Sequence, residues 1–169
     1  ISVHGGSGFI MEYKCQRLFR DARIFSIYEG TTQLQVVAAI RYVTNGTYLG
    51  IIKEMLEKEV APEFQALKER VAKMVEKYED AINYVKAAGN NDLHDFLARR
   101  LYEMTAEIIM SLLILDDATR APELFAKSAN VYVRYAEGTV AGHYAYIKEF
   151  KAEDLADFLA ATPEEAPAE

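Results

Sequence analysis

Glu29 is the side chain of this sequence best placed for acid–base chemistry. It lies in the segment Ile27-Tyr28-Glu29-Gly30-Thr31-Thr32, immediately before a predicted helix. The ordinary role of a carboxylate at that position is to complement the positive end of the helix dipole. The alternative role is that of a general base, which needs a carboxylate within reach of the proton that it removes. Taken alone, Glu29 favours the structural role.

A second segment that suits ligand chemistry is the glycine cluster Gly5-Gly6-Ser7-Gly8. Glycines let the backbone approach a ligand closely or form a tight turn. No predicted strand precedes the cluster, so it is not the dinucleotide-binding fingerprint, in which a strand leads into the glycine loop. By itself the cluster fits a structural turn equally well.

Composition and charge exclude several classes of function. Residues 1–46 hold five Lys/Arg and three Asp/Glu (net +2), whereas residues 47–169 hold fourteen and twenty-three (net −9). The acidic part repels phosphates, so we expect no nucleic-acid partner. Cys15 is the only cysteine and the three histidines lack metal-ligand spacing, so we expect no disulfide and no metal site. The longest apolar run, Ile108 to Leu115, is predicted to be a buried helix face and is too short for a membrane span.

The hydrophobic pattern predicts an all-α protein built as a helical bundle of long up-and-down helices. The first part, residues 1–46, is expected to contain two helices joined by an extended connector at 24–28, whose residues are β-branched and aromatic. The second part, residues 47–161, is expected to form the bundle, and residues 162–169 a disordered tail. The expected helices are 12–23, 32–45, 48–60, one from Pro62 to the turn at Gly89, 92–118, one from Pro122 to Phe150, and a short one with Leu155, Phe158 and Leu159.

Two details of this pattern concern single side chains. Thr32 and Gln35 have the spacing of a capping box, in which the Gln35 side chain returns to the Thr32 amide. The aromatic stripe from Tyr132 through Tyr135 and Tyr144 to Phe150 is predicted to lie mainly in the bundle core rather than to line a ligand site.

In combination the early segments are much more specific than each is alone. The segments Gly5-Gly6-Ser7-Gly8-Phe9, Glu12-Tyr13, Arg20-Asp21-Ala22-Arg23-Ile24 and Ile27-Tyr28-Glu29-Gly30-Thr31-Thr32-Gln33-Leu34-Gln35 follow one another in order. This arrangement resembles the C-terminal signature of the acyl-CoA dehydrogenase family over residues 2–46. Residues 47–161 resemble, more loosely, the helical domain that longer family members carry after the catalytic fold. Ile1 in place of an initiating Met fits a fragment of such an enzyme.

The resemblance implies a role for each residue of the signature. Glu29 corresponds to the base that removes the α-proton of an acyl-CoA thioester while the β-hydride passes to FAD, which gives a trans-2-enoyl-CoA. Gly30 corresponds to a contact with the substrate thioester. The resemblance assigns FAD contacts to Ser2, Val3, His4, Gly5, Gly6, Thr31, Thr32 and Gln33. A helix N-terminus suits a phosphate-bearing cofactor, and enclosure between acyl chain and flavin would raise the pKa of the base.

The resemblance also implies partners and a location. The implied electron acceptor is an electron-transfer flavoprotein, and the implied assembly is a homodimer or homotetramer. The expected location is the cytoplasm for a bacterial-type protein and the mitochondrial matrix for a eukaryotic one. Three alternatives stay open: a dehydrogenase, an oxidase or alkylation-response relative that keeps the flavin, and a helical interaction module without catalysis. The chain alone is expected to be inactive.

Overall fold

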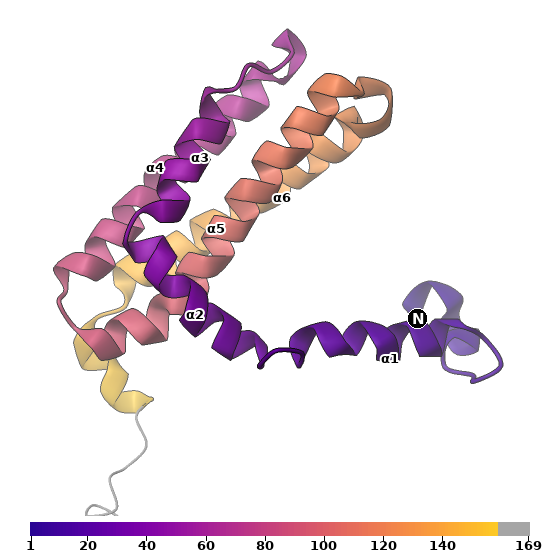
Figure 1. Cartoon of the computed structure of the whole chain (residues 1–169), viewed down its shortest axis with the longest axis horizontal. Coiled ribbons are helices and arrows are strands. Elements are labelled where there is room, and N and C mark those ends of the chain that lie inside the picture. The colour runs from indigo at the N-terminus through magenta and orange to yellow at the C-terminus, as the bar shows by residue number, and fades with distance from the viewer. Residues whose placement is uncertain (159–169) are drawn as a thin grey trace, which may run out of the picture. The chain divides into compact units, whose positions relative to one another are not determined.

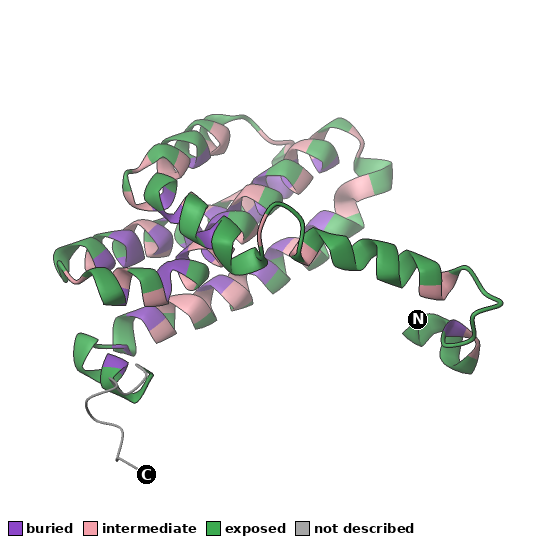
Figure 2. Ribbon diagram, turned by 60° about the horizontal axis from the view of Figure 1, so that its bottom comes forward, coloured by how far each residue is buried: buried purple, intermediate pink, exposed green. Residues whose placement is uncertain are grey.

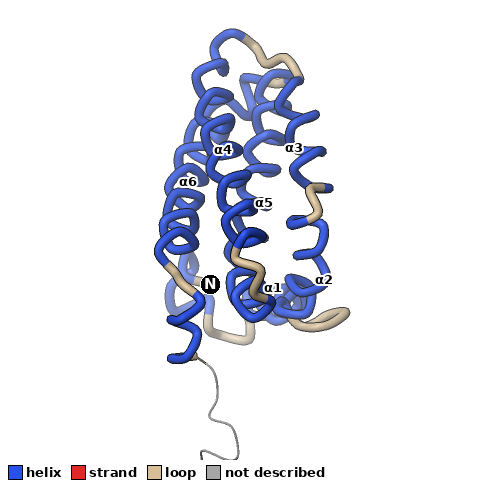
Figure 3. Tube along the Cα trace, turned by 90° about the vertical axis from the view of Figure 1, so that its left-hand side faces the viewer, coloured by secondary structure: helices blue, strands red, loops and turns tan. Residues whose placement is uncertain are grey.

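Helices make up all the regular structure in the described part of the chain. The computed structural model describes residues 1–158, and residues 159–169 lie outside it. Over residues 1–158 there are six α-helices and four 3-10 helices and no strand (Figure 1, Figure 3), so the all-α prediction is confirmed. The predicted disordered tail, 162–169, and Leu159 of the last predicted helix fall outside the described residues.

The chain divides into two compact units, Ile1–Ala38 and Ala39–Glu169, with the boundary inside helix α2. The α-helices are α1 (Cys15–Arg23), α2 (Thr32–Thr44), α3 (Thr47–Glu57), α4 (Gln65–Ala87), α5 (Asn91–Arg120) and α6 (Pro122–Glu149). The 3-10 helices are η1 (Ser2–Gly8), η2 (Ile24–Ser26), η3 (Pro62–Phe64) and η4 (Ala152–Asp157).

Local residue chemistry sets the helix ends in the second unit. Gly46 follows α2 with a φ of 89°, a left-handed conformation that glycine adopts without steric cost. The Asn90 side chain accepts a 3.0 Å hydrogen bond from the Leu93 amide and so caps α5. Pro122 opens α6, where a missing amide proton costs no helical hydrogen bond. The helix ends that the sequence predicted at 45, 92 and Pro122 are therefore confirmed to within one residue.

The segment 24–28 differs from its prediction, because it is helical in part rather than extended. The amides of Ile27 and Tyr28 both donate to the Ile24 carbonyl, at 2.9 and 2.8 Å, and residues 24–26 form η2. The Ser26 hydroxyl donates to the Arg23 carbonyl at 3.0 Å. The β-branched and aromatic composition indicated a strand-like segment, but these hydrogen bonds continue the last turn of α1 and override that weak preference.

In the second unit α4, α5 and α6 pack against one another, and α3 lies against α4 and α5 (Figure 1). Buried residues recur along each of these helices, as the purple parts of the ribbon show (Figure 2). Burial of such apolar surface is the main term that stabilises a bundle. The core includes Ile52, Leu67, Val71, Met74, Leu97, Leu101, Met104, Ile108, Leu115, Val133, Val140 and Ile147.

One buried polar pair joins α4 to α5. The hydroxyl oxygens of Tyr78 and Thr105 lie 2.7 Å apart, and the Thr105 hydroxyl donates to the Leu101 carbonyl at 2.9 Å. Because a threonine hydroxyl has one proton, the proton between the two hydroxyls belongs to Tyr78. Burial raises the pKa of Tyr78 to about 12, which keeps its hydroxyl protonated as this hydrogen bond requires.

Two of the predicted buried faces are partly exposed. In the run Ile108–Leu115, Ile108, Leu112 and Leu115 are buried, but Met110 and Leu113 lie at the surface. Seven apolar residues and Ser111 fill eight consecutive positions of a helix with 3.6 residues per turn, so some of the apolar ones must point away from the core. Tyr135 on α6 is exposed because it lies on the side of the helix opposite the buried Val133 and Val140. Among the described residues, no helix has the length and apolar character that crossing a membrane requires.

Candidate functional site

Glu29 lies in a strained turn directly before α2. Its φ is 52°, and within residues 1–158 it is the single non-glycine residue with a positive φ. Gly30 follows with a φ of 100°. A left-handed conformation costs a non-glycine residue about 1 kcal/mol or more, and such strain is concentrated at functional sites. The protein therefore holds the backbone of Glu29 in one conformation although this conformation costs free energy.

The Gln35 side chain supports this turn from the first turn of α2. Its Nε2 donates a 2.7 Å hydrogen bond to the Glu29 carbonyl, while its backbone amide bonds the Thr31 carbonyl at 3.1 Å. The predicted capping box is therefore wrong about the partner of this side chain. The left-handed Glu29 turns its carbonyl toward the helix start, where the Gln35 amide group can donate to it. Sequence reasoning found the spacing but not the backbone conformation that decides the partner.

Gly30 cannot be replaced without strain. A side chain there would meet its positive φ and would also place its Cβ 3.1 Å from the Leu34 side chain. Only glycine both adopts this positive φ without strain and avoids the contact with Leu34. The tight turn thus depends on Gly30, and it holds the Glu29 carboxylate on the exposed surface of the first unit.

The predicted cofactor residues form two groups within the first unit. Thr31, Thr32 and Gln33 lie at the exposed start of α2, beside Glu29 and Gly30. Ser2 to Gly6 lie in η1, exposed, on the other side of α1 in the chain (Figure 1). The structure therefore brings Thr31–Gln33 next to Glu29 and leaves Ser2–Gly6 as a separate group.

The glycine cluster contains one residue with a purely internal role. A Cβ on Gly8 would lie 2.5 Å from the Ile1 carbonyl oxygen, so the backbone of η1 closes on itself at this point. Gly5 has a φ of 56°, and both Gly5 and Gly6 have open space where a side chain would be. Gly8 therefore makes the turn, while the backbone of Gly5 and Gly6 stays accessible.

Large apolar side chains of the first unit are exposed. Helix α1 has no buried residue, as Figure 2 shows by its colours. Exposed apolar surface of this extent is typical of a region that packs against protein or ligand. The exposed side chains include Phe9, Met11, Leu18, Phe19, Phe25 and Tyr28.

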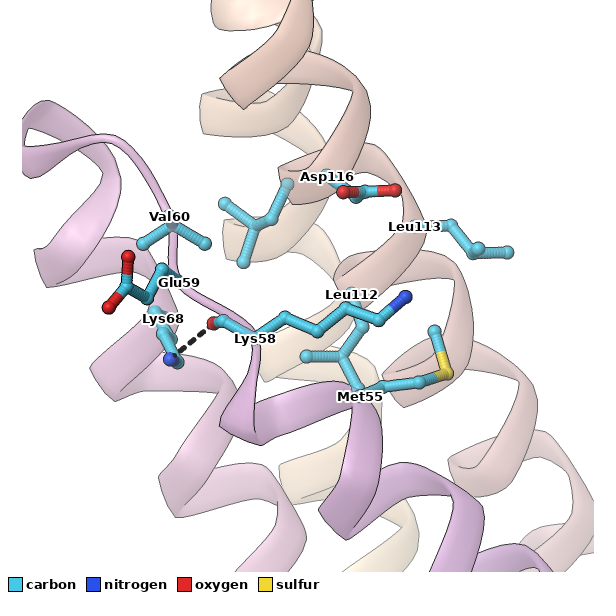
Figure 4. A pocket seen from close by; sticks show the side chains of 9 residues that line it. Met55, Lys58, Glu59, Val60, Lys68, Leu112, Leu113 and Asp116 are labelled. Carbon is cyan, nitrogen blue, oxygen red and sulfur yellow. Dashed lines mark hydrogen bonds between the residues drawn. The ribbon is translucent and has the colours of Figure 1, made fainter.

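A hollow in the second unit lies between the end of α3 and the side of α5 (Figure 4). Met55, Leu112 and Leu113 supply its apolar wall, and Lys68 Nζ donates to the Lys58 carbonyl at 2.6 Å beside it. Its free volume is about 20 Å³. That volume suits a single water molecule, so this hollow does not hold a cofactor.

Both histidines of the second unit contact an acidic side chain. His143 Nε2 lies 3.0 Å from Glu103 Oε2, and burial lowers the pKa of His143 despite the neighbouring carboxylate. His94 Nδ1 lies 2.9 Å from Asp95 Oδ1. In the described range, no three His, Cys, Asp or Glu side chains are grouped so that they could hold a metal ion.

Comparison with known families accounts for both parts of the chain. A family model described as "Acyl-CoA dehydrogenase C terminal" matches residues 44–155, and one described as "Acyl-CoA dehydrogenase, C-terminal domain" matches residues 1–43. The chain belongs to the acyl-CoA dehydrogenase family. The resemblance seen in the sequence is therefore confirmed at the level of the family.

Individual relatives that the chain resembles are also named as enzymes that act on CoA thioesters. Butyryl-CoA dehydrogenase of Syntrophomonas wolfei is 28% identical over 130 residues, which cover 72% of this chain and 21% of the relative. Caffeyl-CoA reductase-Etf complex subunit CarC of Acetobacterium woodii is 57% identical over 35 residues, which cover 21% of this chain and 9% of the relative. The chain thus spans between 9% and 21% of the length of these curated relatives.

A solved structure supports the fold of the second unit. The crystal structure of an acyl-CoA dehydrogenase family protein from Porphyromonas gingivalis matches with a TM-score of 0.64 and 38% identity, over 68% of this chain and 98% of the solved chain. A match of that length extends well beyond the first unit, which ends at Ala38. A chain that consists almost wholly of the matched region therefore folds and crystallises.

Proposed function

We propose that this chain is the C-terminal part of a flavin-dependent acyl-CoA dehydrogenase, with the end of the catalytic domain at residues 1–46 and an appended bundle after it. The observation that carries the proposal is the strained, supported turn at Glu29. The left-handed conformation of Glu29 and the hydrogen bond from Gln35 hold a carboxylate in a specified place. Family membership supplies the chemistry that such a carboxylate would perform.

In this proposal Glu29 removes the α-proton of the acyl-CoA thioester. FAD, when bound, accepts the β-hydrogen as a hydride, so that a carbon–carbon double bond forms and a trans-2-enoyl-CoA results. Gly30 lies against the thioester, where the absence of a side chain leaves room. Positioning of the base relative to the reacting carbon is the contribution of the protein, because the redox chemistry belongs to the cofactor.

The residues proposed to hold FAD have the chemistry that this role needs. Thr31, Thr32 and Gln33 lie at the start of α2, where unpaired amides and the helix dipole favour phosphate groups. The accessible backbone of Gly5 and Gly6, with Ser2, Val3 and His4 before it, would supply further contacts. The exposed apolar side chains of the first unit would pack against the remainder of the enzyme.

An electron-transfer flavoprotein is the proposed redox partner, because one relative is named as a subunit of a reductase-Etf complex. Other relatives are named 3-(aryl)acrylate reductase and acryloyl-CoA reductase (NADH). These names favour a second candidate function, the reduction of a 2-enoyl-CoA, in which the same carboxylate would return the proton to the α-carbon. The proposed assembly is a homodimer or homotetramer.

The test of the proposed function is anaerobic titration of the full-length flavoprotein with a panel of CoA thioesters. Saturated acyl-CoA is expected to bleach the oxidised flavin band, with the chain length that bleaches it fastest identifying the substrate class. For the reductase candidate, the chemically reduced enzyme is instead reoxidised by 2-enoyl-CoA and saturated thioesters bleach it poorly. A flavoprotein that responds to neither set of thioesters contradicts both candidates.

The 169-residue chain alone is expected neither to retain FAD nor to turn over. The proposed cofactor residues lie on exposed backbone of the first unit, so the chain offers the isoalloxazine ring no enclosing wall there. Flavin absorbance of the chain after incubation with FAD and desalting measures retention, with the full-length protein as the positive control. A stoichiometric yellow complex of the chain alone would contradict this expectation.

A further inference from the structure

Helix α6 carries two apolar stripes, and one of them faces away from the bundle. The inner stripe contains Ala129, Val133, Ala136, Val140 and Ile147, all buried. The outer stripe is exposed, and Leu124, Val131 and Tyr135 keep 68%, 71% and 62% of their accessible surface. It recurs at alternating steps of four and three residues, which is the spacing of a helix-packing seam. We name it the α6 outer stripe: Leu124, Ser128, Val131, Tyr135, Gly138, Gly142 and Ala145.

The α6 outer stripe lacks the charges of an ordinary solvated face. None of its seven residues is charged, over six turns of an exposed helix. Tyr132, beside the stripe, has its ring centroid 6.2 Å from that of Tyr135. Together with Lys127, Ser128 and Val131, this tyrosine pair lines a shallow hollow whose surface is almost wholly apolar. An uncharged surface of this kind is typical of a contact with another protein.

Gly138 and Gly142 have no role inside the domain. Both lie within α6, and a Cβ on either would meet no atom within 4 Å. Neither has a φ that requires glycine. Glycine inside a helix costs about 1 kcal/mol relative to alanine, so the two positions weaken α6 without an internal reason. Glycines on an exposed helix face allow a second helix to come close to the backbone.

We propose that the α6 outer stripe is a self-association surface, on which α6 of a second copy of this chain lies antiparallel. The stripe is bulky in its first half, at Leu124, Val131 and Tyr135, and small in its second half, at Gly138, Gly142 and Ala145. An antiparallel copy sets the bulky half of each helix against the small half of the other. The two-fold axis then passes near the middle of the helix, between Tyr135 and Gly138, and the same surface serves both copies.

The charges at the ends of the stripe favour the same orientation. Glu123 and Lys127 lie exposed near the beginning of α6, and Lys148 and Glu149 lie exposed at its end. Antiparallel packing brings Lys127 of each copy near Glu149 of the other, and Glu123 near Lys148. Parallel packing would instead set each of these charges beside its own copy. Parallel packing would also place Tyr135 against Tyr135 and leave glycine against glycine. Size and charge complementarity thus both select a second, antiparallel copy as the occupant.

The first experiment measures association of a chain limited to residues 39–158, the described part of the second unit, since a solved chain that consists almost wholly of the matched region is folded. Sedimentation equilibrium is expected to give a dimer. Gly138→Gln inserts a bulky side chain at the closest approach and is expected to raise the dimer dissociation constant about tenfold or more. Because glutamine forms helix better than glycine, the monomer of this variant is expected to melt at a higher temperature.

The matched control is Gly50→Gln on α3. Gly50 is also a helical glycine with open space around it, but it lies outside the stripe. This variant is expected to gain thermal stability and to keep the dissociation constant of the unsubstituted chain. If the unsubstituted chain stays monomeric, the proposal is overturned. The α6 outer stripe would then be covered by another part of the parent protein. Equal loss of dimer in both variants overturns it as well.

A disulfide experiment tests the orientation. Residues 39–158 contain no cysteine, so Val131→Cys and Gly142→Cys introduce the only thiols. When the two variants are mixed and oxidised, antiparallel packing is expected to give mostly the mixed disulfide. In that packing the two copies of residue 131 are separated by about 16 Å along the axis, too far for a disulfide. Disulfides of each variant with itself, in place of the mixed product, overturn the proposed orientation.

Discussion

Glu29→Gln in the full-length parent protein is expected to leave FAD bound and to slow flavin reduction by acyl-CoA by about 10²- to 10⁴-fold. Glutamine keeps the shape of the side chain but does not take up a proton from the substrate. The turn itself should persist, because the Gln35 hydrogen bond goes to the backbone carbonyl of residue 29 and not to its side chain. Anaerobic stopped-flow measurement of flavin bleaching determines the rate, and flavin content determines cofactor binding.

The control for this substitution is Glu54→Gln. Glu54 is an exposed glutamate on α3, in the second unit, so the same change of charge occurs at a residue that has no proposed role in catalysis or FAD binding. Its reduction rate is expected to equal that of the parent. If the flavin of Glu29→Gln is reduced by acyl-CoA at the parent rate, the base lies elsewhere. The Glu29 carboxylate would then only complement the dipole of α2. Loss of flavin from Glu29→Gln would instead point to a structural role for the turn.

The candidate site was predictable in its residue types and only partly in its geometry. The order of the segments around Glu29 indicated the family, and the family models now cover both parts of the chain. The left-handed backbone of Glu29 was not predictable, because glutamate has no preference for that conformation. The hydrogen bond from Gln35 depends on that backbone, so it was missed along with it.

The fold was predictable where a single residue determines the local backbone. Gly46, Asn90 and Pro122 each end or begin a helix through their own chemistry, and these ends were located correctly. Segments without such residues were less certain, as the helical turn at 24–26 shows. Periodicity also does not distinguish an inner apolar stripe from an outer one. For that reason the exposure of Tyr135, Met110 and Leu113 became visible only in the packed bundle.

Leu101→Ala, a truncation in the buried face of α5, is expected to be strongly destabilising. The Leu101 side chain is 0% exposed, and its loss removes buried apolar surface and leaves a cavity between α5 and its neighbours. Such changes lower the free energy of unfolding by roughly 2–5 kcal/mol. That is a large part of the roughly 5–15 kcal/mol by which a domain is stable. Urea unfolding of residues 39–158, followed by helical circular dichroism, measures the change.

Leu113→Ala on the same helix provides the comparison, since it removes the same atoms from a side chain that is 45% exposed. Its cost is expected to stay below about 1 kcal/mol, because nearly half of its surface is already in water. Both variants should keep the urea dependence of the parent, since the surface exposed on unfolding hardly changes. Equal destabilisation by the two substitutions would mean that a partner covers Leu113 in solution. Because Leu113 lies outside the α6 outer stripe, that partner surface would be distinct from the proposed antiparallel contact.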